Sequence, residues 1–333
     1  MGFGALLGNE QLKENLSAAR RKGRMSHFYL LSGPQGSGKH TLASLIAAAM
    51  LCDKPDGPCG VCQHCRKVLS GSHPDYITID DPSKKTVPVD LIRQARADIF
   101  VRPNEGSKKI YLFPRAQDMG IPGQNALLKV LEEPPSYGVF LLLTDNPEKL
   151  LPTVRSRCVE LKLRALPEAL LGKQLRREFP EADDGSVAAA ILRSGGYLGQ
   201  ARELLSGEGL SENARQFAAA FAARDTFALQ KLLTPMEKWK RDALIPGLQQ
   251  WLELLEQALL SRSGLNAVTK EAAAIGAGRS PRDLMRCCQA LKKAMEYAQG
   301  IVSCAAICGW LSWELRYSRI RRERRPRRSV EEI

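Results

Sequence analysis

A glycine-rich segment near the N-terminus constrains the fold of this chain more than any other part of its sequence. It spans residues 33–39, follows an apolar run at 28–31 that predicts a strand, and precedes a helical pattern at 42–51. In this order of elements, glycines bend the backbone so that its N–H groups and the helix N-terminus face a phosphate. The sequence therefore predicts a phosphate-binding loop, with contacts from Gly33, Gly36, Gly38 and Lys39.

The residue after the loop lysine does not suit the hydrolysis of a nucleotide. In loops that cleave ATP, a Ser or Thr hydroxyl at this position holds Mg²⁺. Here the position is His40, and the hydroxyl of Thr41 comes one residue late. We therefore predict a degenerate nucleotide site, with Thr41 as a further candidate contact, which could hold ATP or ADP without cleaving it. An empty loop that is kept for packing is the alternative.

Strand and helix patterns alternate through residue 163, which predicts a three-layer α/β core with a mainly parallel sheet. Beyond residue 163 the apolar residues follow helical spacing, so we expect only helices there. A glycine-rich break at 206–209 separates a small helical domain, 164–208, from a larger one, 209–318, and 319–333 is a basic tail. The expected strands are Phe28–Leu31, Tyr76–Ile79, Ile110–Phe113, Val139–Leu143 and Val159–Leu161.

Four cysteines with the spacing C-x6-C-x2-C-x2-C follow the first long helical pattern, in an insert at 52–65. They are Cys52, Cys59, Cys62 and Cys65. Four thiolates complete a tetrahedral zinc site and leave no open position, so the predicted zinc is structural. An iron–sulfur cluster is the alternative, but its binding motif would continue with a cysteine three residues on, where this chain has Leu69.

The formal net charge of +13 favours a polyanion among the partners. Much of the excess lies in the tail, which is either a solvated segment or a contact for DNA. Lys84, Lys85, Lys108 and Lys109 are further candidates for contacts with DNA phosphates or with partner proteins, the alternative being lysines that face only water. No run approaches the roughly 20 apolar residues that a membrane span needs, and no export signal is evident, so we expect a cytoplasmic protein without membrane partners.

Two later motifs add a resemblance to a known family. Residues 125–135 read NALLKVLEEPP, and residues 156–158 read Ser-Arg-Cys. Together with the loop and the cysteine array, they resemble bacterial clamp-loader subunits of DNA polymerase III, of the AAA+ class. The resemblance implies an AAA+ core, a helical lid and a helical collar that assembles a hetero-oligomer. The implied partners are gamma/tau and delta subunits, a sliding clamp, and primer–template DNA through the complex.

Family members that hydrolyse ATP carry Asp-Glu-Ala-Asp at the end of the third core strand, where the acids hold Mg²⁺ and polarise water. This chain has Pro114 and Arg115 at the two acidic positions. It also has Gly199 where such members place a sensing arginine. With His40, three parts of a hydrolysis site are missing. The resemblance therefore implies a subunit of the polymerase holoenzyme without ATPase activity of its own.

The resemblance also implies a role for Arg157 as an arginine finger, which reaches the γ-phosphate held by a neighbouring subunit. Such a finger can contribute roughly 10³–10⁵ in rate. A surface arginine in a local ion pair is the alternative. We expect a stator subunit whose Arg157 completes the active site of a neighbouring ATPase subunit. The complex would load the sliding clamp onto primed DNA in the replisome. An active motor ATPase, or a zinc-containing adaptor that binds DNA through its tail, remain alternatives.

Overall fold

The computed structural model describes residues 2–206, 210–262, 269–300 and 302–316. The expected basic tail, 319–333, lies outside the described residues. The chain forms two compact units, the first made of Met1–Leu171 with Gly195–Gln200, and the second of Gly172–Ser194 with the residues from Ala201 on. The expected domain boundaries at 163 and 208 are finer than this division and stay predictions.

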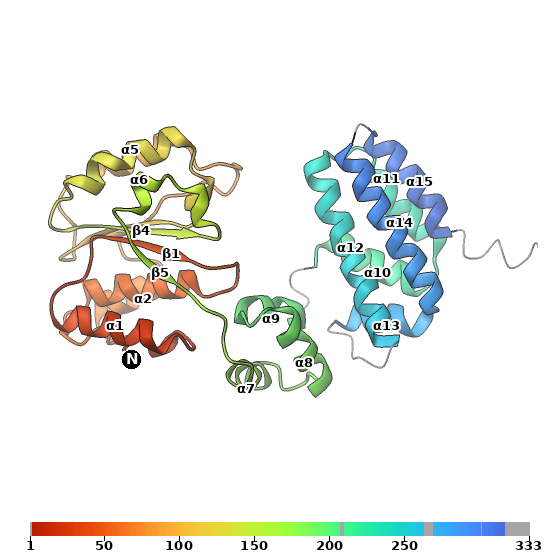
Figure 1. Cartoon of the computed structure of the whole chain (residues 1–333), viewed down its shortest axis with the longest axis horizontal. Coiled ribbons are helices and arrows are strands. Elements are labelled where there is room, and N and C mark those ends of the chain that lie inside the picture. The colour runs from red at the N-terminus through yellow and green to blue at the C-terminus, as the bar shows by residue number, and fades with distance from the viewer. Residues whose placement is uncertain (1, 207–209, 263–268, 301, 317–333) are drawn as a thin grey trace, which may run out of the picture. The chain divides into compact units, whose positions relative to one another are not determined.

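The first unit contains a five-stranded parallel sheet with the strand order β2-β3-β4-β1-β5 (Figure 1). Each expected strand overlaps an observed one, which confirms the predicted three-layer α/β fold. Strand β1 lies between β4 and β5, so the connection from β4 to β5 crosses over β1. The strands are β1 (Phe28–Ser32), β2 (Tyr76–Thr78), β3 (Lys109–Phe113), β4 (Gly138–Thr144) and β5 (Val159–Lys162).

Helices cover both faces of this sheet (Figure 1). Successive residues of β4 alternate between two cores: Leu141 packs with one, and Phe140 and Leu142 with the other. This alternation explains why β4 is apolar along its whole length. The first face carries η1 (Gly2–Ala5), α1 (Glu10–Arg21), α2 (Lys39–Leu51) and α3 (Gln63–Leu69). The second carries α4 (Val89–Asp98), η2 (Ala116–Asp118), α5 (Ile121–Glu132), η3 (Pro147–Lys149) and α6 (Pro152–Arg155).

Past β5, the described residues form helices and their connections, as the apolar spacing predicts. The largest core of this part surrounds the fully buried Trp251, whose ring stacks on Phe217 at 4.1 Å between centroids. None of the described helices is both long enough and apolar enough to cross a lipid bilayer. The helices are α7 (Glu168–Glu178), α8 (Asp184–Arg193), α9 (Leu198–Ser206), α10 (Glu212–Ala222), α11 (Thr226–Met236), α12 (Arg241–Arg262), α13 (Lys270–Gly278), α14 (Pro281–Gln299) and α15 (Cys304–Arg316).

Candidate functional site

The predicted phosphate loop connects the carboxyl end of β1 to α2, which begins at Lys39. Gly36 and Gly38 have φ angles of 75° and 96°, in a region that residues with a Cβ rarely adopt. Because β1 and β4 are neighbours in a parallel sheet, the residues after both strands meet at the same edge. This edge is where ligands bind in open α/β sheets.

The side chain of Lys39 is buried in the loop rather than directed to solvent. Its ammonium donates hydrogen bonds to the carbonyl oxygens of Gly33, at 2.6 Å, and Pro34, at 2.9 Å. It also lies 2.5 Å from the carboxylate of Asp145, which directly follows β4. Sequence reasoning did not identify Asp145. Its only signal, a polar residue after a buried strand, gains meaning once β4 is known to lie beside β1.

Gly199 lies against the loop and contacts it through backbone atoms. The N–H of Gly199 donates to the carbonyl of Gly36 at 2.9 Å, and the side-chain amide of Gln200 donates to the carbonyl of Gln35 at 2.9 Å. A Cβ added to Gly199 would lie 2.4 Å from the Cα of Gly36, so this approach requires glycine. The position that the resemblance gave to a sensing arginine thus lies at the loop, without a charge.

The residues after Lys39 occupy the first turn of α2. His40 and Thr41 are both exposed there. Burial of part of its ring, together with the charge of Lys39, lowers the pKa of His40, while Asp145 opposes this shift. A neutral imidazole next to a lysine is a poor ligand for Mg²⁺, which prefers oxygen.

Arg115 stands at the end of β3, where a hydrolytic site would carry acids. Its guanidinium donates to both carboxylate oxygens of Asp80, at 2.6 and 3.1 Å, and to the carbonyl of Asp81 at 3.0 Å. The hydrogen bonds that its guanidinium donates to Asp80 raise the pKa of Arg115. Asp118, the nearby acid past the strand end, lies 3.8 Å from the same guanidinium. Arg115 therefore fastens the loop that follows β2 to the end of β3.

Among the lysines considered for DNA contacts, Lys109 is wrongly predicted. Its side chain is 3% exposed, and its ammonium lies 2.8 Å from the carboxylate of Asp98 and 3.0 Å from the carbonyl of the same residue. Lys109 begins a central strand, and its long stem reaches the C-terminus of α4, where carbonyl groups lack helical partners. Lys108 donates to the carbonyl of Ser136 at 2.6 Å.

Arg157 follows α6, and its side chain is 37% exposed. It donates to the carboxylate of Glu132, at the end of α5, at 3.0 Å and to the carbonyl of Thr153 at 2.9 Å. The local ion pair considered as an alternative is therefore present. Exposed pairs of this kind contribute only about 0.2–1 kcal/mol, so a stronger anion could replace Glu132.

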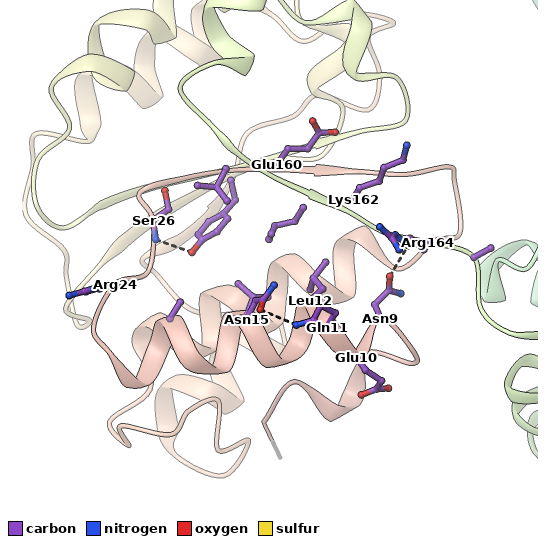
Figure 2. Close-up of a pocket in the computed structure, with 16 residues that line it drawn as sticks. Asn9, Glu10, Gln11, Leu12, Asn15, Arg24, Ser26, Glu160, Lys162 and Arg164 are labelled. Carbon is purple, nitrogen blue, oxygen red and sulfur yellow. Dashed lines mark hydrogen bonds between the residues drawn. The ribbon is translucent and has the colours of Figure 1, made fainter.

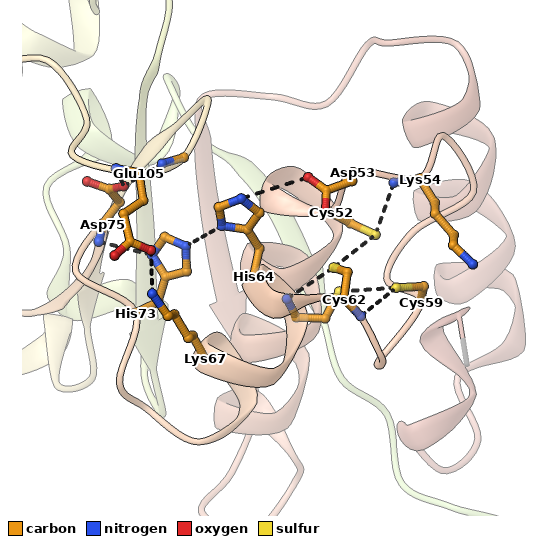
Figure 3. A network of polar contacts seen from close by, with 12 residues as sticks. Cys52, Asp53, Lys54, Cys59, Cys62, His64, Lys67, His73, Asp75 and Glu105 are labelled. Atoms are coloured by element: carbon orange, nitrogen blue, oxygen red, sulfur yellow. Dashed lines mark hydrogen bonds and ion pairs between the residues drawn. The ribbon is translucent and has the colours of Figure 1, made fainter.

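The cysteine array forms a compact cluster between α2 and α3 (Figure 3). Its four sulfur atoms lie within 4.8 Å of one another, including Cys59 and Cys65 at 3.9 Å and Cys52 and Cys62 at 4.0 Å. Tetrahedral coordination with metal–sulfur bonds near 2.3 Å places sulfurs about 3.8 Å apart. The cluster could therefore hold a metal ion with little adjustment.

Backbone N–H groups stabilise the thiolate form of one cysteine in this cluster. The N–H of Cys62 donates to the sulfur of Cys59 at 3.3 Å, and with the N–H of Val61 it lowers the pKa of Cys59 to about 6. Burial raises the pKa of Cys65 to about 12, so a metal would have to displace that proton. A Cβ on Gly57 would lie 2.5 Å from the Cβ of Cys52, which explains the glycine in this turn.

A second cluster, made of His64, His73 and Glu105, lies beside the cysteines (Figure 3). The N–H of Asp75 donates to Nδ1 of His73 at 3.0 Å, so this nitrogen carries no proton and Nε2 does. Nε2 of His73 then donates to Nδ1 of His64 at 2.9 Å. A histidine that binds a metal normally donates from its other nitrogen, which His73 does not. The geometry favours a hydrogen-bonded chain that docks α3, rather than a second metal site.

A groove of about 720 Å³ lies between α1 and the edge strand β5 (Figure 2). Its lining includes Leu12, Leu16, Tyr29 and Val159 together with Glu10, Arg24 and Arg164 at its border. Segments more than a hundred residues apart form it, so sequence patterns did not indicate it.

Comparisons with known proteins agree with the family resemblance. Residues 8–167 match the family model described as "DNA polymerase III, delta subunit". The delta′ subunit of DNA polymerase III from Pseudomonas aeruginosa is 36% identical over 195 residues, which cover 57% of this chain and 59% of that protein. The gamma/tau subunit from Mycobacterium tuberculosis is 34% identical over 210 residues, covering 61% of this chain and 36% of that protein.

The chain thus spans less than two thirds of the length of these relatives. Among solved structures, a DNA polymerase III gamma subunit-related protein from Thermotoga maritima has a TM-score of 0.49 at 17% identity, covering 90% of this chain and 98% of that one. The expected resemblance to clamp-loader subunits is confirmed over residues 8–167.

Proposed function

We propose that this chain is a clamp-loader subunit of the delta-prime type, a stator that does not hydrolyse ATP itself. The similarities to delta′ and to gamma/tau relatives, 36% and 34%, do not separate the two types. The observation that carries the proposal is Arg115, which stands at the end of β3 in an ion pair with Asp80. A guanidinium has no lone pair to offer Mg²⁺, and here it also engages the carboxylate of Asp80.

The loss of metal coordination has a large expected effect on hydrolysis. Metal ions stabilise transferring phosphoryl groups by several kcal/mol, and each 1.36 kcal/mol is a factor of ten in rate. Neither Arg115 nor His40 offers the oxygen that Mg²⁺ requires. ATP cleavage would then have to occur in a neighbouring subunit.

Arg157 is the residue we propose for that neighbouring site. Its guanidinium is partly exposed and, among the residues that the structure describes, it is held by an exposed carboxylate and one carbonyl. A γ-phosphate presented by an adjoining motor subunit offers more negative charge than Glu132, so the guanidinium would exchange partners. There it would stabilise the charge that develops during phosphoryl transfer while the loader sets the clamp on primed DNA.

The other parts of the chain have supporting roles in this proposal. The cysteine cluster would hold zinc, because four sulfur ligands at tetrahedral spacing are typical of structural zinc sites. Residues 164–208 would form the lid, and residues 209–318 the collar that joins the gamma/tau and delta subunits.

The test is Arg157→Ala in a loader reconstituted with its motor and delta subunits. We expect DNA-stimulated hydrolysis at the neighbouring site to fall by roughly 10³-fold or more in single-turnover measurements, and clamp loading to fall with it. Arg155→Ala is the matched control, because Arg155 is two residues away and pairs with Glu148. Unchanged hydrolysis in the Arg157 variant would remove the basis for a finger supplied in trans.

A motor ATPase of the same family is the competing function, favoured by the similarity to gamma/tau relatives. Magnesium-dependent ATP turnover by the purified chain distinguishes it. Turnover that disappears in Lys39→Ala would establish the motor function and contradict the stator.

A further inference from the structure

The phosphate loop is occupied by other parts of the same chain. We propose that Asp145 and Gly199 form an intramolecular clasp on the loop, in which the carboxylate of Asp145 takes the position of an anionic ligand at Lys39. Asp145 is then the residue that determines whether the loop accepts a nucleotide phosphate. This inference concerns the loop of the isolated chain and does not depend on the role proposed for Arg157.

The hydrogen bonds of Lys39 are the first support. A lysine ammonium has three N–H donors. Here they have three acceptors, namely the carbonyls of Gly33 and Pro34 and the carboxylate of Asp145. A phosphate could approach the ammonium only by displacing one of them, and the side chain is only 8% exposed. Burial strengthens the attraction between Lys39 and Asp145 relative to a pair in water.

The backbone of the loop is the second support. The N–H of Ser37 donates to the carbonyl of Pro34 at 3.2 Å, so this group faces the loop itself. On the other side, the carbonyl of Gly36 accepts from Gly199. The N–H of Ser37 is thus paired within the loop, the backbone of Gly36 is held by Gly199, and the added carboxylate repels an anion.

The exposure of Asp145 supports a charge-based role rather than a packing role. Its side chain is 48% exposed, so its replacement leaves no cavity. The turn that carries it is fixed independently, because the N–H of Asn146 donates to Oγ1 of the buried Thr144 at 3.1 Å. Removing the charge should therefore change the loop without disturbing β4.

The clasp has a consequence for the segment Gly195–Gln200. In a loop that requires a nucleotide, contacts around the loop depend on whether phosphate is bound. Here Gly199 and Gln200 bind loop carbonyls directly. We therefore infer that this segment stays on the loop whether or not ATP is present.

The experiment compares the full chain with Asp145→Asn, an isosteric change that removes the charge. ADP and ATP are titrated calorimetrically, each with and without Mg²⁺. We expect the parent chain to bind ADP weakly and the variant to bind it roughly ten- to hundredfold more tightly, because Lys39 loses its anionic partner. Glu148→Gln is the control, since Glu148 follows in the same turn, carries the same charge and pairs with Arg155 instead.

Equal ADP affinity in the parent chain and the Asp145 variant would overturn the proposal, whether both bind or neither does. The thermal midpoint of the variant verifies that it is folded. For the Gly199 half of the clasp, amide hydrogen exchange is measured in Gly199→Ala. We expect faster exchange at residues 195–200 and unchanged exchange in the cysteine cluster. Unchanged protection at 195–200 would contradict the contact with Gly36.

Discussion

In the first unit, three cationic side chains form ion pairs with acids that are distant in sequence. Arg115 pairs with Asp80, Lys109 with Asp98, and Lys39 with Asp145. Lys39 and Lys109 are largely withdrawn from solvent and Arg115 is partly so, and each of these three acids lies more than ten residues from its cation in sequence. A substitution at any of these positions therefore affects the link between two segments as well as one side chain.

The pair Asp98–Lys109 has a testable dependence on pH. Hydrogen bonds from Lys109 and from Tyr111 lower the pKa of Asp98 below its ordinary value of 3.8. As pH falls, the unfolded chain takes up the proton before the folded chain does, so stability is present above about pH 4 and is lost as pH falls through the folded-state pKa.

We therefore expect the free energy of unfolding to fall less between pH 7 and pH 3 in Asp98→Asn than in the parent chain. Urea unfolding at the two pH values measures this difference. Asp90→Asn is the control, because Asp90 lies on the same helix and is 83% exposed. An acid dependence in Asp98→Asn as steep as that of the parent chain would contradict the stabilising role of the pair.

At the scale of elements, the cysteine cluster determines how α3 is fixed to the core. Cys62 caps the N-terminus of α3, and Cys65 lies buried within it. On the opposite side, Lys67 of α3 pairs with Glu105 at 2.5 Å, and His64 meets His73. A helix of seven residues is too short to be stable alone, so these contacts hold it.

We expect one bound metal ion per chain in the parent protein, and none in Cys62→Ser, measured by elemental analysis. His73→Ala should retain one ion, because the hydrogen bond from Asp75 makes His73 an unsuitable ligand. Cys158→Ser, outside the cluster, is the matched control and should also retain one. Two ions in the parent chain, or loss of the ion in His73→Ala, would show that the second cluster binds metal.

At the scale of the whole molecule, each of the two compact units has hydrophobic cores of its own. The chain's four tryptophans, Trp239, Trp251, Trp310 and Trp313, all belong to the second unit. Tryptophan fluorescence therefore reports the unfolding of the second unit, whereas circular dichroism reports the loss of helix in both units.

We expect metal chelation to lower the thermal midpoint seen by circular dichroism while leaving the fluorescence midpoint unchanged. Leu248→Ala, a truncation in the second core, should lower the fluorescence midpoint instead, since such changes cost about 2–5 kcal/mol. A single transition that shifts identically in both experiments would mean that the units unfold as one.

Features that depend on short stretches of sequence were predicted correctly. The loop at 33–39, the five strands and the clustering of Cys52, Cys59, Cys62 and Cys65 follow from local patterns of glycine, apolar residues and cysteine. These features can be predicted from the sequence because turn geometry, strand burial and the spacing of metal ligands each depend on only a few neighbouring residues. Lys109 was wrongly predicted as a surface residue because its burial depends on Asp98, which belongs to another element.

The sequence by itself determined a glycine-rich loop between β1 and α2, Pro114 and Arg115 after β3, and four clustered cysteines that could hold a metal ion. Only the tertiary structure decided which groups meet there. Parallel pairing of β1 with β4 brings Asp145 to Lys39, and the return of the chain at 195–200 brings Gly199 to Gly36. The reason is physical. Electrostatic attraction and packing depend on the distance between groups in space, and for residues far apart in the sequence that distance is set by the order of the strands in the sheet.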